Sequence, residues 1–600
     1  MKKKKYSFLL LVCCVATLVN VSCTSHNDFY PTGAITDFRE LRKEFSNPSP
    51  EYRTIPFFVW NGKITKPAID SFMISFKDAG FGGVFIHARP GLITSYLTDE
   101  WFDLFKYTVN KGREFGIKVW IYDEYNFPSG FAGGNVPAKM PESANQGQGI
   151  QLKKFESLPP DAGDAYLILK KDGDKFAEIT DLQNEAGKTG SYYVFTKSWY
   201  NKGDNDYYFH GKWYGGFTYV DLLYPGVTEK FIGETMSGYE KCAGDEFGKF
   251  MPGIFTDEPH LNSPGGIRWT PDLFDVFIQK WGYDLKINLP SLYEEVGDWK
   301  KIRHNYAQTL LQLFIERWAK PYYEYCQKKG LKLTGHYWEH TWPFIRLGPD
   351  NMAMYPWFQI PGIDNLFNQF NETSTSAQFG NIRSVKELSS VANQFGLHRT
   401  LSETYGGAGW DLSFADMKRL GDWEYALGVN LMNQHMSPIT LEGYRKYDHP
   451  PYFTYHEPWW KDYKYLNTYF ARLSAALSSG RQVNDILILE PTTTAWMYDS
   501  YQKPSERTGE IGNSFQSFVT ALEKAQVGYD LGSEKIIRDN GKIEKGKFII
   551  GKCSYSGVVI PPMTENLDKQ TFVLLKQYME EGGKLLLFSI PDKIDGSLSP

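Results

Sequence analysis

The stretch Gly253-Ile-Phe-Thr-Asp-Glu-Pro-His260 decides the fold class. A short apolar run ends at Asp257 and Glu258, and the next residue is a proline, which cannot continue the interior of a sheet. A second stretch, His398-Arg-Thr-Leu-Ser-Glu-Thr-Tyr-Gly-Gly407, repeats the pattern and ends its apolar run at Glu403. In a (β/α)8 barrel the reacting groups stand at the carboxyl ends of the strands. The two stretches therefore predict a barrel with an acid at two of its strand ends.

Further apolar runs lie on both sides of these stretches and alternate with helix-like segments. They are Ile55–Trp60, Gly83–His87, Lys118–Tyr122, Leu331–Thr334, Gly362–Leu366 and Val429–Asn433. Alternation of this kind is typical of parallel βα units. With the runs at 253–256 and 397–402, eight strands can be counted. The prediction is an α/β fold, a (β/α)8 TIM barrel over residues 51–480.

Two regions fall outside the barrel pattern. Residues 150–222 are turn-rich and aromatic and alternate with a period of two, which predicts a β-rich insertion. From residue 483, short apolar runs at 485–490, 547–550, 557–560 and 584–588 are separated by helix-like segments. This pattern predicts a second, open-sheet α/β domain over 483–600. Because the sequence stops directly after a strand, we expect this domain to be truncated.

The two acids suit the cleavage of a glycosidic bond. Glu258 closes the fourth strand and Glu403 the seventh, and these strands face one another across the barrel mouth. One carboxyl group can protonate the leaving oxygen, while the other attacks the sugar or activates a water. We expect Glu258 to be the general acid and Glu403 the nucleophile or the base. Glu339 also follows a strand and is the alternative acid.

Other polar and aromatic residues gather at the predicted strand ends. A hydroxyl-rich ligand needs fixed donors and acceptors, and aromatic rings can stack on a sugar face. The predicted substrate-binding residues are Trp60, Asn61, His87, Arg89, Asp123, Glu124, Asp257, His336, Trp338, Glu339, Trp410 and Asn433. His340, Asp364 and His435 also stand at strand ends. Each single residue could equally serve ordinary packing or hydrogen bonding.

Two other functions remain open at this point. His336-Tyr-Trp-Glu-His340 matches H-x-x-E-H, a zinc-hydrolase pattern that requires a helix, whereas the preceding residues predict a strand and a turn. Alternatively, the protein could be a catalytically inactive surface lipoprotein that binds glycans. Opposed carboxylates argue against a pure binding site. We expect no required cofactor, and the sequence assigns no metal ligands.

The N-terminus predicts export. Lysines 2–5 precede an apolar run from Phe8 to Val19, which is too short to span a membrane. The run leads to Val21-Ser22-Cys23, so residues 1–23 resemble a lipoprotein signal with Cys23 as the lipidation site. Residues 24–50 would then be a linker. We expect an outer-membrane-anchored lipoprotein, otherwise a secreted one, that touches the membrane only through Cys23.

Composition limits the class of partner. Of 600 residues, 16% are aromatic, and the net charge of −5 does not favour a nucleic acid. A carbohydrate is the expected substrate. Apart from those in the signal, the cysteines are Cys242, Cys326 and Cys553, whose spacing predicts neither a disulfide framework nor a metal site.

Several of these motifs resemble those of known glycosidases. Phe57-Phe-Val-Trp-Asn-Gly62, Gly82–Gly91 and Tyr122–Gly134 resemble large secreted glycoside hydrolases of polysaccharide-degrading Bacteroidetes, in the neighbourhood of family 106, the α-L-rhamnosidases. Asp257-Glu258-Pro259 and Ser402-Glu403 look like the acid/base and nucleophile positions of the clan A barrels. Residues 483–600 resemble the amidotransferase-like domain of family 42 β-galactosidases.

The resemblance has consequences for mechanism. Similarity to family 106 implies a reaction that inverts the configuration at the anomeric carbon, and it implies a bound calcium ion. Similarity to clan A implies retention through a covalent intermediate. Both imply a glycosidase that removes a sugar from a plant or host glycan, α-L-rhamnosidase-like or β-galactosidase-like.

Overall fold

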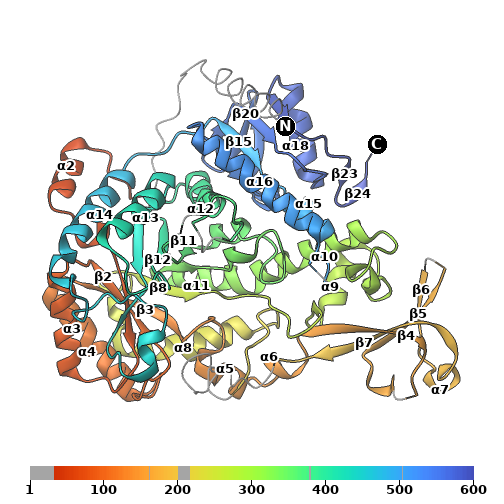
Figure 1. Ribbon diagram of the computed structural model, residues 1–600, viewed down its shortest axis with the longest axis horizontal. Helices are drawn as coiled ribbons and strands as arrows, with labels where there is room; N and C mark the ends of the chain where they lie inside the picture. The colour runs from red at the N-terminus through yellow and green to blue at the C-terminus, as the bar shows by residue number, and fades with distance from the viewer. Residues whose placement is uncertain are drawn as a thin grey trace.

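The computed structural model describes residues 33–160, 162–173, 175–200, 217–369, 371–376, 380–502 and 504–599. The chain builds a barrel, an antiparallel sheet that projects from it, and a second domain that packs on the barrel's helices (Figure 1). Cys23 and the predicted signal lie outside the described residues. Residues 24–50, expected as a linker, include the helix α2 (Phe38–Ser46), which packs against α14 (Tyr463–Leu477).

The barrel is one parallel sheet in the order β13-β12-β11-β10-β8-β3-β2-β1-β14. Its strands are β1 (Phe57–Trp60), β2 (Gly83–Ala88), β3 (Lys118–Tyr125), β8 (Gly253–Asp257), β10 (Lys332–His336), β11 (Ile360–Asn365), β12 (Leu401–Thr404), β13 (Leu431–Gln434) and β14 (Ser437–Pro438). The last two are pieces of one stretch, separated by His435 and Met436. Together β13 and β14 form the eighth strand of the barrel. Because β13 pairs with β12 and β14 pairs with β1, this strand nearly closes the barrel.

Helices cover the outside of the barrel. They are α3 (Lys66–Asp78), α4 (Asp99–Phe115), α8 (Val227–Ala243), α9 (Leu273–Trp281), α10 (Trp299–Phe314), α11 (Lys320–Lys329), α12 (Ile382–Phe395), α13 (Phe414–Leu427) and α14. Local sequence sets their ends: Asn381 caps the first turn of α12 through the Ser384 N–H, and Gly396, at φ 66°, ends that helix.

Alternation along the strands fills the barrel. In β1, Phe57 and Val59 point inward to a cluster with Phe85, Tyr122 and Phe255, whereas Phe58 and Trp60 point outward to the helices. The inward rings fill the interior of the barrel below the carboxyl ends of the strands. Beyond those ends the described residues leave a cavity.

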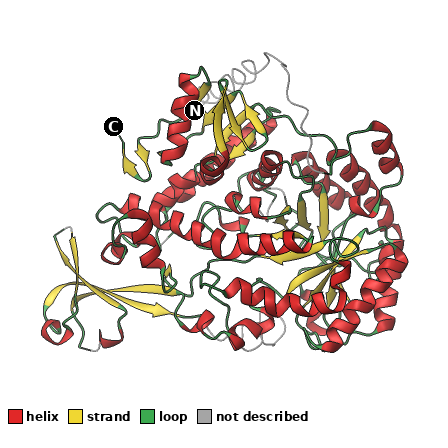
Figure 2. Cartoon of the chain, turned by 180° about the vertical axis from the view of Figure 1, so that it is seen from behind, coloured by secondary structure: helices red, strands yellow, loops and turns green. Residues whose placement is uncertain are grey.

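The insertion forms an antiparallel sheet in the order β6-β5-β7-β4-β9. Its strands are β4 (Gly149–Ser157), β5 (Leu167–Asp172), β6 (Lys175–Glu178), β7 (Thr189–Ser198) and β9 (Ile267–Arg268). The first four follow β3, as predicted, while β9 comes from the loop after β8. This sheet extends away from the barrel, as both overall views show (Figure 2).

The second domain has a parallel sheet of β15 (Ile486–Leu489), β16 (Asp530–Gly532), β20 (Gly557–Ile560) and β22 (Lys584–Leu587), in the order β16-β15-β20-β22. The helices α15 (Thr492–Tyr498), α16 (Glu506–Lys524), α17 (Glu534–Asn540) and α18 (Lys569–Glu580) accompany it. Short antiparallel pieces complete the domain: β17 (Gly541–Glu544), β18 (Lys547–Ile550), β19 (Cys553–Tyr555), β23 (Lys593–Ile594) and β24 (Ser597–Leu598), with β21 (Asn566–Leu567) pairing parallel to β23. One apolar core runs from the barrel helices into this domain.

The predicted fold class is confirmed, including the weak sixth strand, which is β11. One strand assignment was wrong. Residues 547–550 belong to the antiparallel sheet β17-β18-β19, and the second parallel strand is β16, which is only three residues long. A buried apolar run of four residues does not show which sheet it joins. None of the described helices has the length and apolar character needed to cross a membrane.

Candidate active site

The carboxyl ends of the barrel strands surround a cavity of about 190 Å³. Its walls are Arg89, Phe127, Asp257, Glu258, His336, Trp338, Asp364, Leu366, Glu403, His435 and His449. The strand register explains why the polar residues meet. His336 is the partner of Asp257 across β10 and β8, and Asp364 is the partner of Glu403 across β11 and β12. Partners in a parallel sheet share a face, and here that face is the interior of the barrel.

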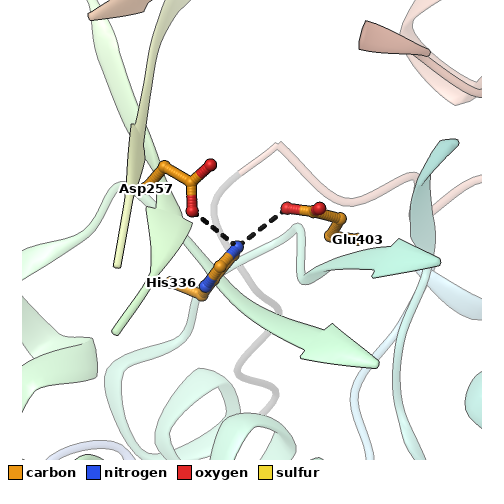
Figure 3. Close-up of side chains that lie close together, drawn as sticks. All are labelled: Asp257, His336 and Glu403. Atoms are coloured by element: carbon orange, nitrogen blue, oxygen red, sulfur yellow. Dashed lines mark hydrogen bonds and ion pairs between the residues drawn. The ribbon is translucent and has the colours of Figure 1, made fainter. Parts of the chain in front are cut away.

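Asp257 and Glu403 share one imidazole (Figure 3). Nε2 of His336 lies 2.8 Å from a Glu403 oxygen and 3.5 Å from an Asp257 oxygen. The other ring nitrogen, Nδ1, lies 3.1 Å from the carbonyl oxygen of Tyr337 and donates to it. The second oxygen of Asp257 accepts from the Tyr122 hydroxyl. The three groups therefore form one connected network at the base of the cavity.

Glu258 and Asp364 share a second imidazole. Nε2 of His340 lies 3.3 Å from Glu258 and 3.2 Å from Asp364. Glu258 has φ 49°, in the left-handed region that a glutamate rarely adopts. This conformation interrupts the alternation of β8, so that Asp257 and Glu258, although adjacent in sequence, both face the cavity. The two imidazoles thus bridge two pairs of carboxylates.

The cavity walls shift the protonation of these groups. Burial raises the pKa of Glu258 to about 7, against the opposing hydrogen bond from His340. Burial and the Asp364 charge hold the pKa of Glu403 above its usual range, although the His336 hydrogen bond opposes this. Burial opposes the charge on His340, but Asp364 and Glu258 raise its pKa to about 10. Glu258 is therefore an acid that can keep its proton near neutral pH, beside a cationic imidazole.

An ion pair forms another part of the wall. Nε and a terminal nitrogen of Arg89 donate to the two carboxylate oxygens of Asp448 at 2.7 and 2.6 Å, and both side chains are buried. The guanidinium also lies 5.4 Å from the centre of the Phe127 ring. Such a bidentate pair holds Arg89 rigidly at the cavity edge. His449, next to Asp448, lines the cavity as well.

Some predicted binding residues lie elsewhere because of strand alternation. Trp60 points out of the barrel and packs against Trp101. The Asn61 amide exchanges hydrogen bonds with the backbone of Thr440. Asn433 is an interior residue whose side-chain nitrogen donates to the Ile55 carbonyl oxygen. None of these three lines the cavity.

His87 and the two acids near the end of β3, Asp123 and Glu124, lie below or beside the cavity. His87 is fully buried and stacks on the Tyr122 ring, with ring centres 3.5 Å apart. Asp123 accepts from Ser129 and Tyr322. Glu124 accepts from the backbone N–H groups of Tyr125 and of residues 130–133. Its carboxylate thus holds the loop after β3 in place.

Glu339, the alternative acid, and Trp410 also lie off the cavity wall. Burial raises the pKa of Glu339 to about 7, but its carboxylate accepts from the Tyr355 hydroxyl behind the cavity. Trp410 is 48% exposed and packs edge-on against Tyr452. Trp338 does line the cavity, and its ring lies edge-on to His340. Of the predicted aromatic faces, Trp338 is the one placed to meet a bound sugar.

The H-x-x-E-H motif is not helical. His336 ends β10 and His340 lies in the short 3-10 turn Glu339–Thr341. Each imidazole faces its own pair of carboxylates. A zinc site of the kind that this motif normally builds needs both imidazoles on one face of a helix.

The donors in the cavity do not fit calcium. Calcium takes six to eight oxygen ligands. Among the described residues, the compact donor sets here are Asp257, His336 and Glu403, and Glu258, His336 and Asp364. Both sets include the imidazole of His336, and the carboxylates of the second set are also bridged by His340, where calcium would require oxygen.

The site also contains residues that sequence reasoning did not single out. His449, Phe127 and Leu366 complete the wall, and Asp448 holds the wall residue Arg89. Asp448 follows the eighth strand at a distance, in Asp448-His-Pro-Pro451, and the signal that could have found it is an acid beside a turn in the last barrel loop. Phe127 lies in the loop that Glu124 holds.

Fold and cavity together define a class. A parallel barrel with carboxylates at opposed strand ends, followed by an open-sheet domain, is the arrangement of a barrel glycoside hydrolase. The family comparison agrees. Residues 216–586 match glycoside hydrolase family 106, described as alpha-L-rhamnosidase, and the chain belongs to this family.

Solved structures share the fold. A rhamnosidase from Novosphingobium sp. PP1Y has a TM-score of 0.65 at 13% identity and matches 92% of this chain and 70% of its own. A cold-adapted β-galactosidase from Rahnella sp. R3 has a TM-score of 0.52 at 10% identity, matching 92% and 74%. A catalytic mutant of a family 42 β-galactosidase from G. stearothermophilus has a TM-score of 0.52 at 11% identity, matching 91% and 73%.

A curated protein from Formosa agariphila, "Putative beta-glucuronidase", is 23% identical over 337 residues. The match covers 54% of this chain and 26% of that protein, so the chain spans about a quarter of its length.

Proposed function

We propose that this glycoside hydrolase removes a single terminal sugar from a plant or host oligo- or polysaccharide. The observation that carries the proposal is the placement of Glu258 and Glu403 in one cavity of about 190 Å³. Sites for drug-sized ligands occupy roughly 300–1,000 Å³, so this cavity suits one sugar ring. Trp338 offers an apolar face for that ring, and Arg89 offers donors to its hydroxyl groups.

Glu258 is the general acid in this proposal. A pKa of about 7 keeps its carboxyl group protonated in mildly acidic solution, as transfer to the leaving oxygen requires. Glu403 is the nucleophile or the base. Burial and the Asp364 charge raise the pKa of Glu403, and the contact with His336 opposes that shift and favours the negative charge that either role needs. Glu258→Gln and Glu403→Gln, assayed on a cleaved substrate, test the assignment, and near-full activity of either variant would overturn it.

The stereochemical outcome follows from the separation of the two carboxyl groups. A separation of about 5–5.5 Å accompanies retention, and one of about 6.5–9.5 Å leaves room for water and accompanies inversion. Following the anomer of the first product by NMR decides between nucleophile and base for Glu403. A product that keeps the substrate's configuration assigns the nucleophile.

The substrate class rests on relatives rather than on the cavity. Family 106 favours an α-L-rhamnoside, in agreement with the rhamnosidase structure from Novosphingobium, whereas the β-galactosidase structures favour a β-galactoside. A screen of aryl glycosides, including rhamnosides, galactosides and glucuronides, would identify the sugar. The proposal predicts release of monosaccharide from the non-reducing end, and release of longer fragments would contradict it.

We further propose that the two imidazoles supply the positive charge among the acids, so that no metal cofactor is required. The protein is also proposed to be exported and anchored through a lipid on Cys23, on the basis of its N-terminal sequence. Mass spectrometry of the mature N-terminus tests the anchor, with Cys23→Ser as the control that should shift the protein to a soluble fraction.

A further inference from the structure

The segment 337–351 connects the cavity to the second domain. It follows β10 and carries Trp338 and His340 toward the cavity. Its later part leaves the barrel and packs against the second domain, on the side of the parallel sheet where the carboxyl ends of β15 and β16 lie. We call this side the strand-end edge. The segment thus has one end at the proposed catalytic groups and the other inside a different domain.

Five hydrogen bonds hold the later part of the segment. They join Trp342 Nε1 to Thr492 Oγ1 (3.0 Å), the Ile345 N–H to Asp499 Oδ2 (3.0 Å), Arg346 to the Ser500 carbonyl oxygen (3.3 Å), Trp496 Nε1 to the Pro349 carbonyl oxygen (2.7 Å) and Ser533 Oγ to Asp350 Oδ2 (2.7 Å). All five cross from the barrel to the second domain. Four of them are fully buried, where an unpaired group is costly.

The second-domain partners share one location. Thr492 and Ser533 come shortly after β15 and β16 and lie at the carboxyl ends of these neighbouring parallel strands. Trp496 lies in α15, the helix that follows β15, and Asp499 and Ser500 come directly after that helix. In open α/β sheets this edge is where ligands bind. Here Trp342 and Asp350 occupy it and are themselves only 4% and 5% exposed. The edge that would receive a free ligand in an open sheet is filled by the barrel's own segment.

Further hydrogen bonds hold the part of the segment that lies nearest the cavity. Asn351 Nδ2 donates to the Trp338 carbonyl oxygen at 3.0 Å. Arg383 donates to the Glu339 carbonyl oxygen at 3.2 Å, and its guanidinium lies 4.5 Å from the Trp342 ring centre. The backbone just before His340 is therefore tied to Asn351 and Arg383, and Trp342, two residues after His340, is held by Thr492 of the second domain.

The segment is also tied to the loop that follows Glu258. The Leu261 N–H donates to the Leu347 carbonyl oxygen at 2.9 Å, and the Glu258 N–H donates to the His336 carbonyl oxygen at 3.2 Å. A shift of the segment would therefore move His340 and disturb the backbone that orients Glu258.

We propose that the strand-end edge of the second domain is a socket for segment 337–351, and that Thr492 and Asp499 are positioning residues for His340 and Trp338. The inference rests on the proposed role of the cavity in glycoside cleavage. Neither Thr492 nor Asp499 lines the cavity, so both act through the segment. Displacements of about 1 Å can lower a rate by about a hundredfold, which makes such distant supports measurable.

Two pairs of variants test the socket. Thr492→Val removes the hydroxyl that accepts from Trp342, whereas Thr492→Ser keeps it. Asp499→Ala removes the oxygen that accepts from the Ile345 N–H, whereas Asp499→Asn keeps one. We expect kcat to fall about ten- to a hundredfold in Thr492→Val and Asp499→Ala, with KM changed less. Thr492→Ser and Asp499→Asn should recover most of the loss.

Hydrogen–deuterium exchange supplies a readout that does not depend on activity. Peptides covering 337–351 should exchange faster in Thr492→Val and Asp499→Ala than in the wild type. Tyr578→Phe is the matched control, because it removes a second-domain hydrogen bond to the Ser556 carbonyl oxygen away from the socket. It should leave both exchange of 337–351 and kcat unchanged.

The outcomes separate this inference from the proposed function. Wild-type kcat and unchanged exchange of 337–351 in folded Thr492→Val and Asp499→Ala would overturn the socket. Equal losses in Thr492→Ser and Thr492→Val would overturn it too, because the hydroxyl would then not be the cause. Full activity in Glu258→Gln would instead overturn the catalytic assignment, while faster exchange of 337–351 would still support the socket.

Discussion

The barrel and the second domain both carry buried acids at the carboxyl ends of parallel strands, but in different surroundings. At the barrel mouth, Asp257, Glu258, Asp364 and Glu403 surround open space. At the edge of the open sheet, Glu490 follows β15 and Glu534 follows β16, and both are buried against other groups. Glu534 accepts from the Asp568 N–H and the Thr493 hydroxyl. An acid at a strand end therefore marks an active site only where the packing leaves room for a substrate.

Substitution of acids at the two edges should separate catalysis from packing, with the largest effect at the barrel mouth. Glu258→Gln and Glu403→Gln should lower kcat/KM by about 10²–10⁴-fold, because each removes a proton-transfer or charge-bearing group. Glu534→Gln keeps an acceptor oxygen and should leave kcat/KM close to the wild-type value. Steady-state kinetics on an aryl glycoside measures all three. Equal losses at both edges would remove the distinction drawn between them.

Breaking a buried ion pair should lower the free energy of unfolding more at the barrel mouth than beside the filled edge of the second domain. Asp448→Asn leaves Arg89 buried without its charged partner and should lower the free energy of unfolding by about 3–5 kcal/mol. Glu387→Gln removes the partner of Arg383 on the barrel helix α12, which packs against the filled edge, but Glu490 of that edge lies beside both and can ionise in its place. Its effect should be smaller. Urea denaturation of the two variants checks the order.

The Asp448 contribution also has a pH dependence. Arg89 overcomes the effect of burial and holds the pKa of Asp448 below its usual range in the folded state. The stabilisation is therefore present above the pKa of the unfolded carboxyl, about 3.9, and is lost as the pH falls through the folded-state value. Asp448→Asn should accordingly destabilise the protein less in strong acid than at neutral pH.

The pH dependence of the reaction sharpens the account of the barrel mouth. Because Glu258 must be protonated to act as the acid, kcat/KM should fall as the pH rises through about 7. His340 lowers this pKa, while Asp257 and Asp364 raise it, so His340→Gln should shift the alkaline limb to higher pH. His398→Gln is the control, since His398 precedes β12 at the opposite end of the barrel and donates to the Ser478 carbonyl oxygen. A limb that does not move in His340→Gln would contradict the assignment.

The smallest expected effect concerns metals. Imidazole nitrogens already stand between the carboxylates of each pair, so removal of calcium should change neither kcat nor the melting temperature. Dialysis against EDTA, followed by added calcium, measures both. Loss of activity that calcium restores would show that the acids reorganise around a cation.

Much of the site could be predicted from the sequence because two patterns depend only on neighbouring residues: an acid at the end of an apolar run, and the alternation of inward and outward side chains along a strand. An acid that ends an apolar run predicts a strand-end carboxylate, and this placed Asp257, Glu258, Asp364 and Glu403 correctly at the barrel mouth. Alternation could also have shown that Trp60 and Asp123 point outward, since each has the opposite parity to an inward residue of its strand. The left-handed conformation of Glu258 depends on tertiary contacts, so no strand pattern could reveal it.

The sequence by itself determined the barrel, the family-type motifs and the two glutamates, because apolar periodicity and strand ends are written in neighbouring residues. Only the tertiary structure decided which side chains meet. It paired His336 with Glu403 and His340 with Glu258, joined Arg89 to Asp448, and filled the second domain's edge with segment 337–351. These contacts join residues tens to hundreds of positions apart. Their geometry depends on how the strands register and how the domains pack, which no local pattern encodes.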